Sequence, residues 1–537
     1  MILSYILHGH LPIYSPEPAH VDHLLHVKLE AAPHLLDADV PALTEHFAAS
    51  RLSYSTQALP VNVLLDTLVR PNIDVVEDGE SVTNLQWRDE PTKAVPHLVL
   101  GDASQPGGQW TNDPLQDNQT LSYAPMMSLP GYSYAQHYRR RTGRDLPAFN
   151  RPARRDLTDY LCSYPKEVNI EPVFRSGANV SGISRTENGF YIRSHNVLCR
   201  HLVLATGVFS EVIPPPPLLR PLLLAPPQLQ PTPEAPLLVV GSGFSAADAI
   251  IASPATQRII HVFKWDPEFR PSPLHGCHPQ AYPEYAGVYR LMKRTALFSE
   301  GWSRRATFRS KGNASLTGFL EARCWDQIYE GLANVEIVGV DMQQPGHEAT
   351  VTFRREADGT VFSRQVRGLV YAVGRRGNLD YLDRSLLREV IAGGEEEGGT
   401  PGGASVDTLG PMIVGQTLRN KAYDDLEVAR NVFIIGSLTG DSLIRFAYGG
   451  CVYTAGKLIR AYTHSHNMHE TDDTDKPIKG SGNTNGQLEL STSSTKRPLT
   501  LAMNGMEGHD HNYNVISSVS DKRGLPSWLW SPVSFWR

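Results

Sequence analysis

The clearest pattern of apolar positions is a buried strand followed by a glycine turn and a helix. Residues 237–240 (Leu-Leu-Val-Val) form an apolar run typical of a parallel strand, and residues 244–251 suit the start of a helix. Between them, Gly241 allows a tight turn, Gly243 lets a pyrophosphate approach the backbone, and Ala246 lets helix and strand pack closely. The helix N-terminus would attract phosphate through its amides and its dipole. The pattern therefore predicts a dinucleotide-binding turn, although a strand–turn–helix unit that binds nothing has the same pattern.

After this turn the apolar positions take the period of β-structure. Residues 259–264 predict a second strand, and residues 335–340 and 349–353 predict an antiparallel meander with a turn at 358–359. A closing apolar strand, residues 368–374, ends in a small glycine turn. The order in this half is therefore glycine turn, helix, strand, meander and closing strand.

The first half of the chain repeats this order without the opening turn. Strands at 180–183 and 190–193, joined by an Asn-Gly turn at 188–189, predict a hairpin, and the buried strand 201–207 ends in Ala-Thr-Gly. Residues 1–14 pattern as the body of an apolar helix, with no strand and no glycine turn before it. The repetition predicts two related domains, and it leads us to expect that the chain begins one strand and one turn too late.

Other glycine turns follow predicted strands. A strand at 97–100 leads into Gly107-Gly108-Gln-Trp110, which would either admit a ligand beside the indole or simply pack the tryptophan. Residues 60–70 suit a helix with a buried face. A strand at 431–436 leads to Gly440 and Asp441, and residues 445–460 suit a helix.

Composition limits the function classes that the chain can serve. The chain has 537 residues, 41% of them hydrophobic, and a net charge of −6 with both signs interspersed, so nothing favours a nucleic-acid partner. Its five cysteines form no Cys-x-x-Cys pair, which excludes a redox-active disulfide of that type. No apolar run approaches the roughly 20 residues of a transmembrane helix, and the start lacks a signal peptide's basic flank. The expected protein is soluble and cytoplasmic, and His275, Cys277 and His278 are too close together to predict a metal site.

The motifs in this order resemble the oxidative stress-induced growth inhibitor family, within the flavin-containing monooxygenase superfamily. The resemblance covers roughly residues 1–462 and is carried by Leu3-Ser-Tyr-Ile-Leu-x-Gly9, Gly107-Gly-x-Trp110, Gly131-Tyr-Ser, Gly241-x-Gly-x-Ser-Ala-Ala-Asp248, His261-Val-Phe, Tyr282-Pro-Glu-Tyr285 and Gly440-Asp-x-x-x-Arg445-Phe with Gly449-Gly450.

The resemblance implies an α/β fold with two Rossmann-like domains, an FAD domain and an inserted NADPH domain, each with a β-meander. The expected boundaries are 1–212 for the first part of the FAD domain, 213–236 for a Pro-rich linker, 237–374 for the NADPH domain, 375–463 for the closing part of the FAD domain with a Gly/acidic insertion at 391–405, and 464–537 for a disordered tail. Trp528, Trp530 and Trp536 make the tail a candidate docking segment for a protein partner.

The implied cofactors are FAD and NADPH, and the missing first glycine turn puts FAD in doubt. Asp441 resembles the aspartate that hydrogen-bonds a flavin ribityl hydroxyl, but its position also suits a helix N-cap. Lys264, at the end of the second strand, favours NADP over NAD, with Arg270 as a second candidate for the 2′-phosphate; Asp266 nearby weakens this argument. The full set of candidate cofactor-binding residues is Gly107, Gly108, Trp110, Gly207, Gly241, Ser242, Gly243, Ser245, Ala246, Lys264, Arg270, Gly374, Gly436, Gly440, Asp441 and Arg445.

Two functions follow from the resemblance. In the first, NADPH passes hydride to FAD, and the reduced flavin activates O2 to oxygenate a substrate that the sequence does not identify; no side chain is singled out as a catalytic acid or base. In the second, the protein keeps the scaffold without activity and regulates growth or stress signalling, because a fold alone does not establish a function.

Overall fold

The structure is a computed structural model of the whole chain. It describes residues 1–45, 47, 58–71, 82–111, 116, 119–223, 236–277, 279, 282–299, 319, 322–342, 348–392 and 412–472. Residues Met1–Thr463 belong to one compact unit.

The predicted strand–turn–helix unit lies at the centre of a parallel sheet, which confirms the α/β class. The sheet has the order β12-β11-β10-β16, with β10 at Leu237–Val240, β11 at Ile259–Phe263, β12 at Tyr329–Ala333 and β16 at Gly368–Tyr371. Val239 of β10 lies between His261 of β11 and Val370 of β16. We call residues 237–374 the dinucleotide lobe and the rest of the compact unit the first lobe.

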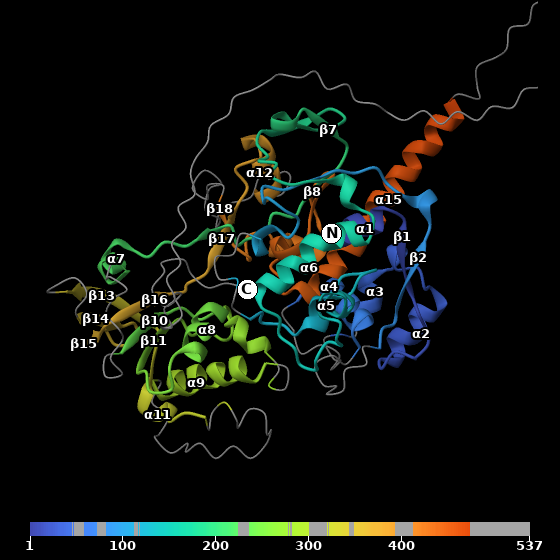
Figure 1. The fold of residues 1–537 in the computed structure, drawn as a ribbon. Helices are drawn as coiled ribbons and strands as arrows, with labels where there is room; N and C mark the ends of the chain where they lie inside the picture. The colour runs from blue at the N-terminus through green and yellow to red at the C-terminus, as the bar shows by residue number, and fades with distance from the viewer. Residues whose placement is uncertain are drawn as a thin grey trace, which may run out of the picture. The chain divides into compact units, whose positions relative to one another are not determined.

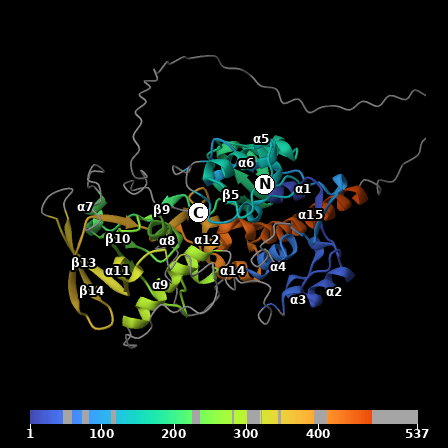
Figure 2. The same cartoon turned by 60° about the horizontal axis from the view of Figure 1, so that its bottom comes forward.

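The two faces of this sheet are covered by different elements. Val239 faces a core formed with α8 (Phe244–Ala252) and α9 (Pro283–Ser299), whereas Leu238 faces a core shared with the meander. The meander consists of β13 (Val335–Asp341), β14 (Ala349–Arg355) and β15 (Val361–Val366), as the sequence predicts. Figures 1 and 2 agree in showing α8 on one side of β10 and the meander on the other.

The first lobe also contains parallel pairs and a meander. Strand β8 (Leu202–Leu204) pairs in parallel with β20 (Val432–Ile434), which pairs with β19 (Glu427–Ala429), and β3 (Val99–Leu100) pairs in parallel with β4 (Phe174–Arg175). Its meander is β5 (Ile183–Thr186), β6 (Gly189–Ile192) and β7 (Val197–Cys199). The prediction of a strand at 180–183 is therefore displaced by three residues, because the tight turn at Asn188-Gly189 sets the register.

The start of the chain differs from the predicted helix over 1–14. Helix α1 covers only Ile2–Leu7, and β1 (His10–Tyr14) then pairs antiparallel with β2 (Leu85–Asp89). Gly9 separates them with a φ of 99°, and a Cβ there would lie 2.7 Å from the carbonyl oxygen of Glu90. The glycine lets the chain reverse against β2, a long-range pairing that apolar periodicity does not reveal.

Helices and connections complete the unit. The predicted helix at 60–70 is confirmed as α4 (Pro60–Val69), and the one at 445–460 begins later, after a 3₁₀ turn at Ile444–Phe446. The remaining helices are α2 (His23–Ala31), α3 (Val40–Thr44), α5 (Tyr134–Thr142), α6 (Arg154–Glu167), α7 (Arg220–Leu223), α11 (Trp325–Ile328), α12 (Arg384–Ala392), α14 (Arg419–Asp424) and α15 (Ala447–Asp472).

The two chain connections between the lobes lie side by side. Strand β9 (Glu211–Val212), which follows the Gly207 turn, pairs antiparallel with β17 (Arg375–Asn378), which follows the Gly374 turn and also pairs with β18 (Met412–Ile413). The two closing turns predicted from the repeat therefore lead into one small sheet.

Three predicted linker or tail segments fall partly outside the described residues. The Pro-rich stretch contains α7, while 224–235 lie outside. The Gly/acidic insertion lies outside from residue 393 on, and the tail lies outside from residue 473 on, including its three tryptophans. Helix α15 extends beyond the predicted start of the tail, to Asp472.

Candidate functional site

The Gly241 turn is built so that only glycine fits at its first position. Gly241 has a φ of 141°, and a Cβ there would lie 2.2 Å from the carbonyl oxygen of Ala372, just after β16. Its amide donates to the carbonyl oxygen of Val262 at 2.9 Å. The requirement for glycine therefore comes from the packing of the parallel strands themselves.

At Gly243 the described residues impose no such requirement. Gly243 is the N-cap residue of α8 with a φ of −103°, it makes no side-chain cap, and a Cβ there would meet only Pro273 Cγ at 3.8 Å. Ser242 accepts a 2.6 Å hydrogen bond on its carbonyl oxygen from Ser272 Oγ, and Ala246 is buried against the sheet. This cradle fits the pyrophosphate of a dinucleotide, because no Cβ at Gly243 stands between a ligand and the backbone at the start of α8.

His261 of the neighbouring strand β11 hydrogen-bonds the Gly241 turn, a role that the sequence did not predict. It is fully buried in β11, and its Nε2 lies 2.6 Å from the carbonyl oxygen of Gly241 while its Nδ1 lies 2.8 Å from the hydroxyl of Tyr329. Because a carbonyl oxygen only accepts, Nε2 carries the proton and Nδ1 accepts from the tyrosine. Burial lowers the pKa of His261 to about 4. The motif His261-Val-Phe was the one signal of this contact in the sequence.

The neutral state of His261 predicts a pH dependence of stability. Its pKa falls from 6.5 in the unfolded chain to about 4 in the folded one, so the unfolded chain binds more protons between these values. The free energy of unfolding should therefore fall as the pH is lowered from about 7 to about 5, with His261 contributing ~2 kcal/mol of that loss. His261→Gln keeps a donor near the Nε2 position. Its free energy of unfolding, measured by urea titration at the two pH values, should fall by ~2 kcal/mol less than that of the wild type. Equal losses in both proteins would contradict the assignment.

The charged residues that bear on the choice between NADP and NAD are Lys264, Asp266 and Arg270, and their contacts differ. Lys264 forms an ion pair with Glu356, which follows β14, and Asp266 Oδ1 accepts from the amide of Phe269 at 3.1 Å. The Asp266 carboxylate therefore stabilises its own turn. Arg270 is exposed and makes no ion pair with any residue that the structure describes.

We therefore expect Arg270 to contribute more than Lys264 to recognition of a 2′-phosphate. Arg270→Ala should weaken NADPH binding about fivefold to tenfold and leave NADH binding nearly unchanged, since one exposed charge-assisted contact is worth about 1 kcal/mol. Lys264→Ala should have a smaller effect, because Glu356 already neutralises that ammonium. Isothermal titration with both dinucleotides measures this, and a larger loss for Lys264→Ala would reverse the order.

In the first lobe, several candidates gather at the carboxyl ends of β8 and β20. Gly207 has a φ of 73°, and a Cβ there would lie 2.9 Å from Ser437 Oγ; Gly436 has a φ of 66° with open space around it. Gly440 has a φ of 87° and packs against Gly415 and Arg419. Parallel strand ends of this kind are where ligands bind in open α/β sheets, so the Gly207 and Gly436 backbone fits a flavin dinucleotide.

Asp441, however, is already engaged by the protein. Its carboxylate is 5% exposed and accepts from the Leu59 amide at 2.9 Å, from Asn62 Nδ2 at 2.6 Å and from Arg419 Nη1 at 2.7 Å. Leu59 is the N-cap residue of α4, so Asp441 caps a helix other than the one that follows it. Asp441 is therefore not the local N-cap that the sequence predicts, since Leu443 takes that position at the following 3₁₀ turn. Its contact with a flavin stays a prediction.

Asn62 also fastens α4 to the start of α15. Since the Asp441 carboxylate only accepts, the Asn62 amide nitrogen faces it, and the Asn62 oxygen accepts from the Gly450 amide at 2.9 Å. A Cβ at Gly449 would lie 2.3 Å from the carbonyl oxygen of Val61. The Gly449-Gly450 pair therefore permits close contact between the two helices.

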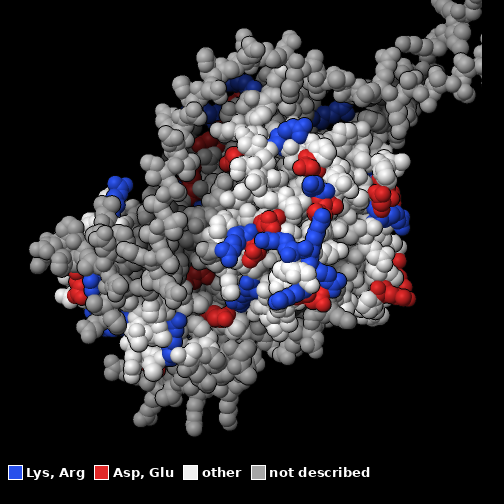
Figure 3. Space-filling model, in the orientation of Figure 1, with Lys and Arg blue, Asp and Glu red and all other residues white. Residues whose placement is uncertain are grey.

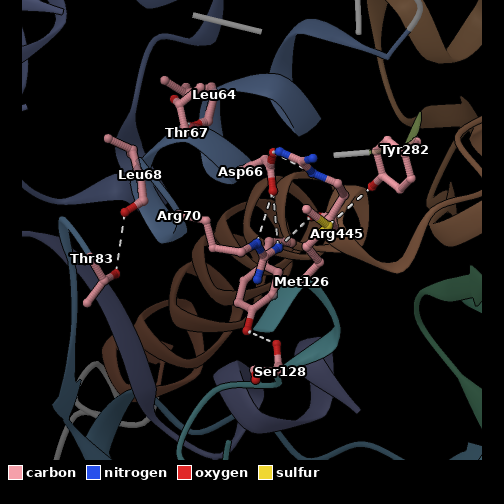
Figure 4. Close-up of polar contacts among 11 residues, drawn as sticks. Leu64, Asp66, Thr67, Leu68, Arg70, Thr83, Met126, Ser128, Tyr282 and Arg445 are labelled. Atoms are coloured by element: carbon pink, nitrogen blue, oxygen red, sulfur yellow. Dashed lines mark hydrogen bonds and ion pairs between the residues drawn. The ribbon is translucent and has the colours of Figure 1, made fainter. Parts of the chain in front are cut away.

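Arg445 belongs to the same buried region (Figure 4). Asp66 of α4 accepts from Arg445 Nε at 2.9 Å and from Arg70 Nε at 3.2 Å, and all three side chains are at most 7% exposed. The Arg70 guanidinium also lies over the ring of Tyr448. We call these residues the polar cluster: Asn62, Asp66, Arg70, Arg419, Asp441 and Arg445.

The other candidates lie elsewhere. The Gly107–Trp110 turn packs on α6: a Cβ at Gly107 would lie near Leu161 and Cys162, and the Trp110 carbonyl oxygen accepts from Thr158. Gly374 has a φ of 111° with open space around it. Trp110 packs against the core that contains α6, and Ser245 lies in the first turn of α8.

Basic side chains on the face that Figure 3 shows lie beside acidic ones. Figure 3 shows Lys and Arg interspersed with Asp and Glu over the visible face. The arginines of α5 pair with acids, Arg139 with Asp145 and Arg140 with Glu167. Within the described ranges, no group of His, Cys, Asp and Glu could hold a metal ion, and no helix has the length and apolar character to cross a bilayer.

Comparisons with known proteins agree with the motifs. No family model matches the chain. Oxidative stress-induced growth inhibitor 1 of Mus musculus is 26% identical over 509 residues, covering 86% of this chain and 93% of the relative, and oxidative stress-induced growth inhibitor 2 of Homo sapiens is 25% identical over 512 residues, covering 84% and 89%. A flavin-containing monooxygenase from Stenotrophomonas maltophilia is similar in structure with 15% identity and a TM-score of 0.40, covering 68% of this chain and 91% of that one. That TM-score is low, and the fold class rests on the strand order described above. The matches over most of the chain confirm the resemblance seen in the motifs: the chain is similar to the oxidative stress-induced growth inhibitors.

Proposed function

We propose that the protein binds NADPH at the Gly241 turn and, together with a flavin, acts as an oxidoreductase of the monooxygenase type. The observation that carries the proposal is the turn itself. Gly241 is imposed by the strands, whereas at Gly243 a Cβ would meet only Pro273 among the described residues, and its absence leaves room for a phosphate beside the first turn of α8. The relatives' names point to growth control during oxidative stress as the setting.

Each part of the chain has a role in this proposal. Gly241, Ser242, Gly243 and the first turn of α8, including Ser245, hold the pyrophosphate, and Arg270 holds the 2′-phosphate. Gly207 and Gly436 present backbone to FAD, which when bound accepts hydride from NADPH and reduces oxygen. His261 holds the first peptide of the turn in place. The polar cluster keeps α4 and the start of α15 fixed beside the strand ends.

A second candidate function is regulation of growth without catalysis. The observation that favours it is the Asp441 carboxylate, which is 5% exposed and already accepts from three protein donors. In this alternative the lobes serve as a scaffold, and NADPH would bind as a signal rather than as a reductant.

Absorbance and oxygen uptake of the purified protein separate the two. The proposal expects flavin absorption bands, or their appearance after reconstitution with FAD, and oxygen uptake that depends on NADPH. A colourless protein that binds NADPH, resists reconstitution and consumes no oxygen would support the regulator instead. A protein that binds neither NADPH nor FAD would refute both candidate functions, since each requires NADPH at the Gly241 turn.

A further inference from the structure

The motif Tyr282-Pro-Glu-Tyr285 lies at the start of α9. Its last residue holds the helix that follows the glycine turn. The Tyr285 hydroxyl donates to Asp248 Oδ1 of α8 at 2.6 Å, and its ring packs edge-on against Phe244, the first residue of α8, with centroids 5.4 Å apart. Tyr285 therefore connects α9 to the turn of helix that would contact phosphate.

The first and third residues of the motif reach into the first lobe. The Tyr282 hydroxyl donates to the sulfur of Met126 at 3.2 Å, and both side chains are buried (Figure 4). Glu284 pairs with Arg151 at 3.5 Å, and the Arg151 guanidinium stacks on the ring of Tyr123 at 4.7 Å. The motif thus contacts both the nucleotide helix and a segment distant from it in sequence.

That segment, residues 119–128, joins the two hydrophobic cores, and we call it the connecting segment. Met126 is buried in the core of the dinucleotide lobe, whereas Met127, the next residue, is buried in the core of the first lobe. The segment is held by Ala124, whose amide donates to the Asn150 carbonyl oxygen at 2.8 Å. A displacement of Met126 is therefore transmitted to the first core through a single peptide bond, because both side chains are close-packed.

The far end of the connecting segment contacts the polar cluster. The Ser128 carbonyl oxygen accepts from the hydroxyl of Tyr448 at 2.8 Å, and Tyr448 stacks under Arg70. Figure 4 shows Tyr282, Met126 and Ser128 together with Asp66, Arg70 and Arg445. A continuous series of buried and part-buried contacts thus runs from α8 to the start of α15.

We propose that Tyr282 and Glu284 are positioning residues that couple the Gly241 turn to the polar cluster through the connecting segment. A dinucleotide that orders the first turn of α8 would order Tyr285, the connecting segment and the start of α15 in succession. Coupling of this kind is a free energy shared between two sites and is reciprocal. The inference rests on dinucleotide binding at the Gly241 turn, the proposed function.

Hydrogen exchange of the full chain with and without NADP⁺ tests the coupling. In the wild type we expect slower exchange with NADP⁺ in three segments: 241–248, 121–128 and 444–451. The effect at 444–451 should be about fivefold or more, the lower end of typical couplings. In Tyr282→Phe/Glu284→Gln, protection at 241–248 should remain while that at 444–451 is lost. Glu336→Gln, which breaks an exposed ion pair with Arg354 in the same lobe, is the matched control and should behave as the wild type.

The outcomes separate this inference from the proposed function. Protection at 241–248 alone in the wild type, or full protection at 444–451 in the double variant, would overturn the coupling while leaving dinucleotide binding intact. No protection at 241–248 in the wild type would overturn the proposed function, and the coupling with it. If the double variant does not fold, Tyr282→Phe, which removes only one hydroxyl, serves in its place, and full protection at 444–451 there would equally overturn the coupling.

Discussion

Gly243→Val is expected to abolish dinucleotide binding at the Gly241 turn while leaving the protein folded. Gly243 has a negative φ, and a Cβ there meets only Pro273 at an ordinary contact distance of 3.8 Å. The valine side chain would instead occupy the space through which a pyrophosphate approaches the backbone. We expect the affinity for NADPH to fall by at least about 100-fold, or ~2.7 kcal/mol, in isothermal titration, with an unchanged unfolding midpoint in urea.

Two other glycines serve as controls. Gly101→Val places the same side chain in open space in the first lobe and should change neither affinity nor stability. Gly241→Ala should destabilise the protein, because its Cβ would lie 2.2 Å from the carbonyl oxygen of Ala372 at a φ of 141°. If Gly243→Val binds NADPH with wild-type affinity, the dinucleotide binds at a site other than the Gly241 turn.

Asp66→Asn is expected to destabilise the protein strongly, by about 3–5 kcal/mol in the free energy of unfolding. The substitution keeps the shape of the side chain but removes the charge that both Arg70 and Arg445 contact, and these guanidiniums are 3% and 7% exposed. A buried guanidinium that loses its partner has neither an opposite charge nor water to solvate it. Urea unfolding followed by circular dichroism measures the loss.

Asp145→Asn provides the matched comparison for this prediction. Asp145 pairs with Arg139 on the surface, with both side chains more than two-thirds exposed, so its replacement should cost less than about 1 kcal/mol. A cost below about 1 kcal/mol for Asp66→Asn as well would mean that the polar cluster does not depend on that carboxylate.

Local patterns in the sequence were sufficient for the dinucleotide lobe. Apolar runs, period-two alternation and the glycines between them predict β10, the Gly241 turn, β11 and the meander, and the structure confirms each of them. These features are encoded by neighbouring residues, because strand periodicity and positive φ act over a few positions. The same local signals predicted α4, and they placed Gly207 and Gly374 at the ends of buried strands.

Only the tertiary structure determined the partners of the polar side chains. Asp441 meets Asn62, 379 residues away in the sequence, and His261 meets Tyr329 and the Gly241 carbonyl oxygen. The sequence could place Asp441 after a strand, but whether a carboxylate there faces a cofactor or caps a distant helix depends on which element packs beside it. The end of α1 at Leu7 has the same origin, since β1 forms by pairing with β2, some 70 residues later in the chain. Periodicity specifies which face of an element is buried, and only packing specifies what it is buried against.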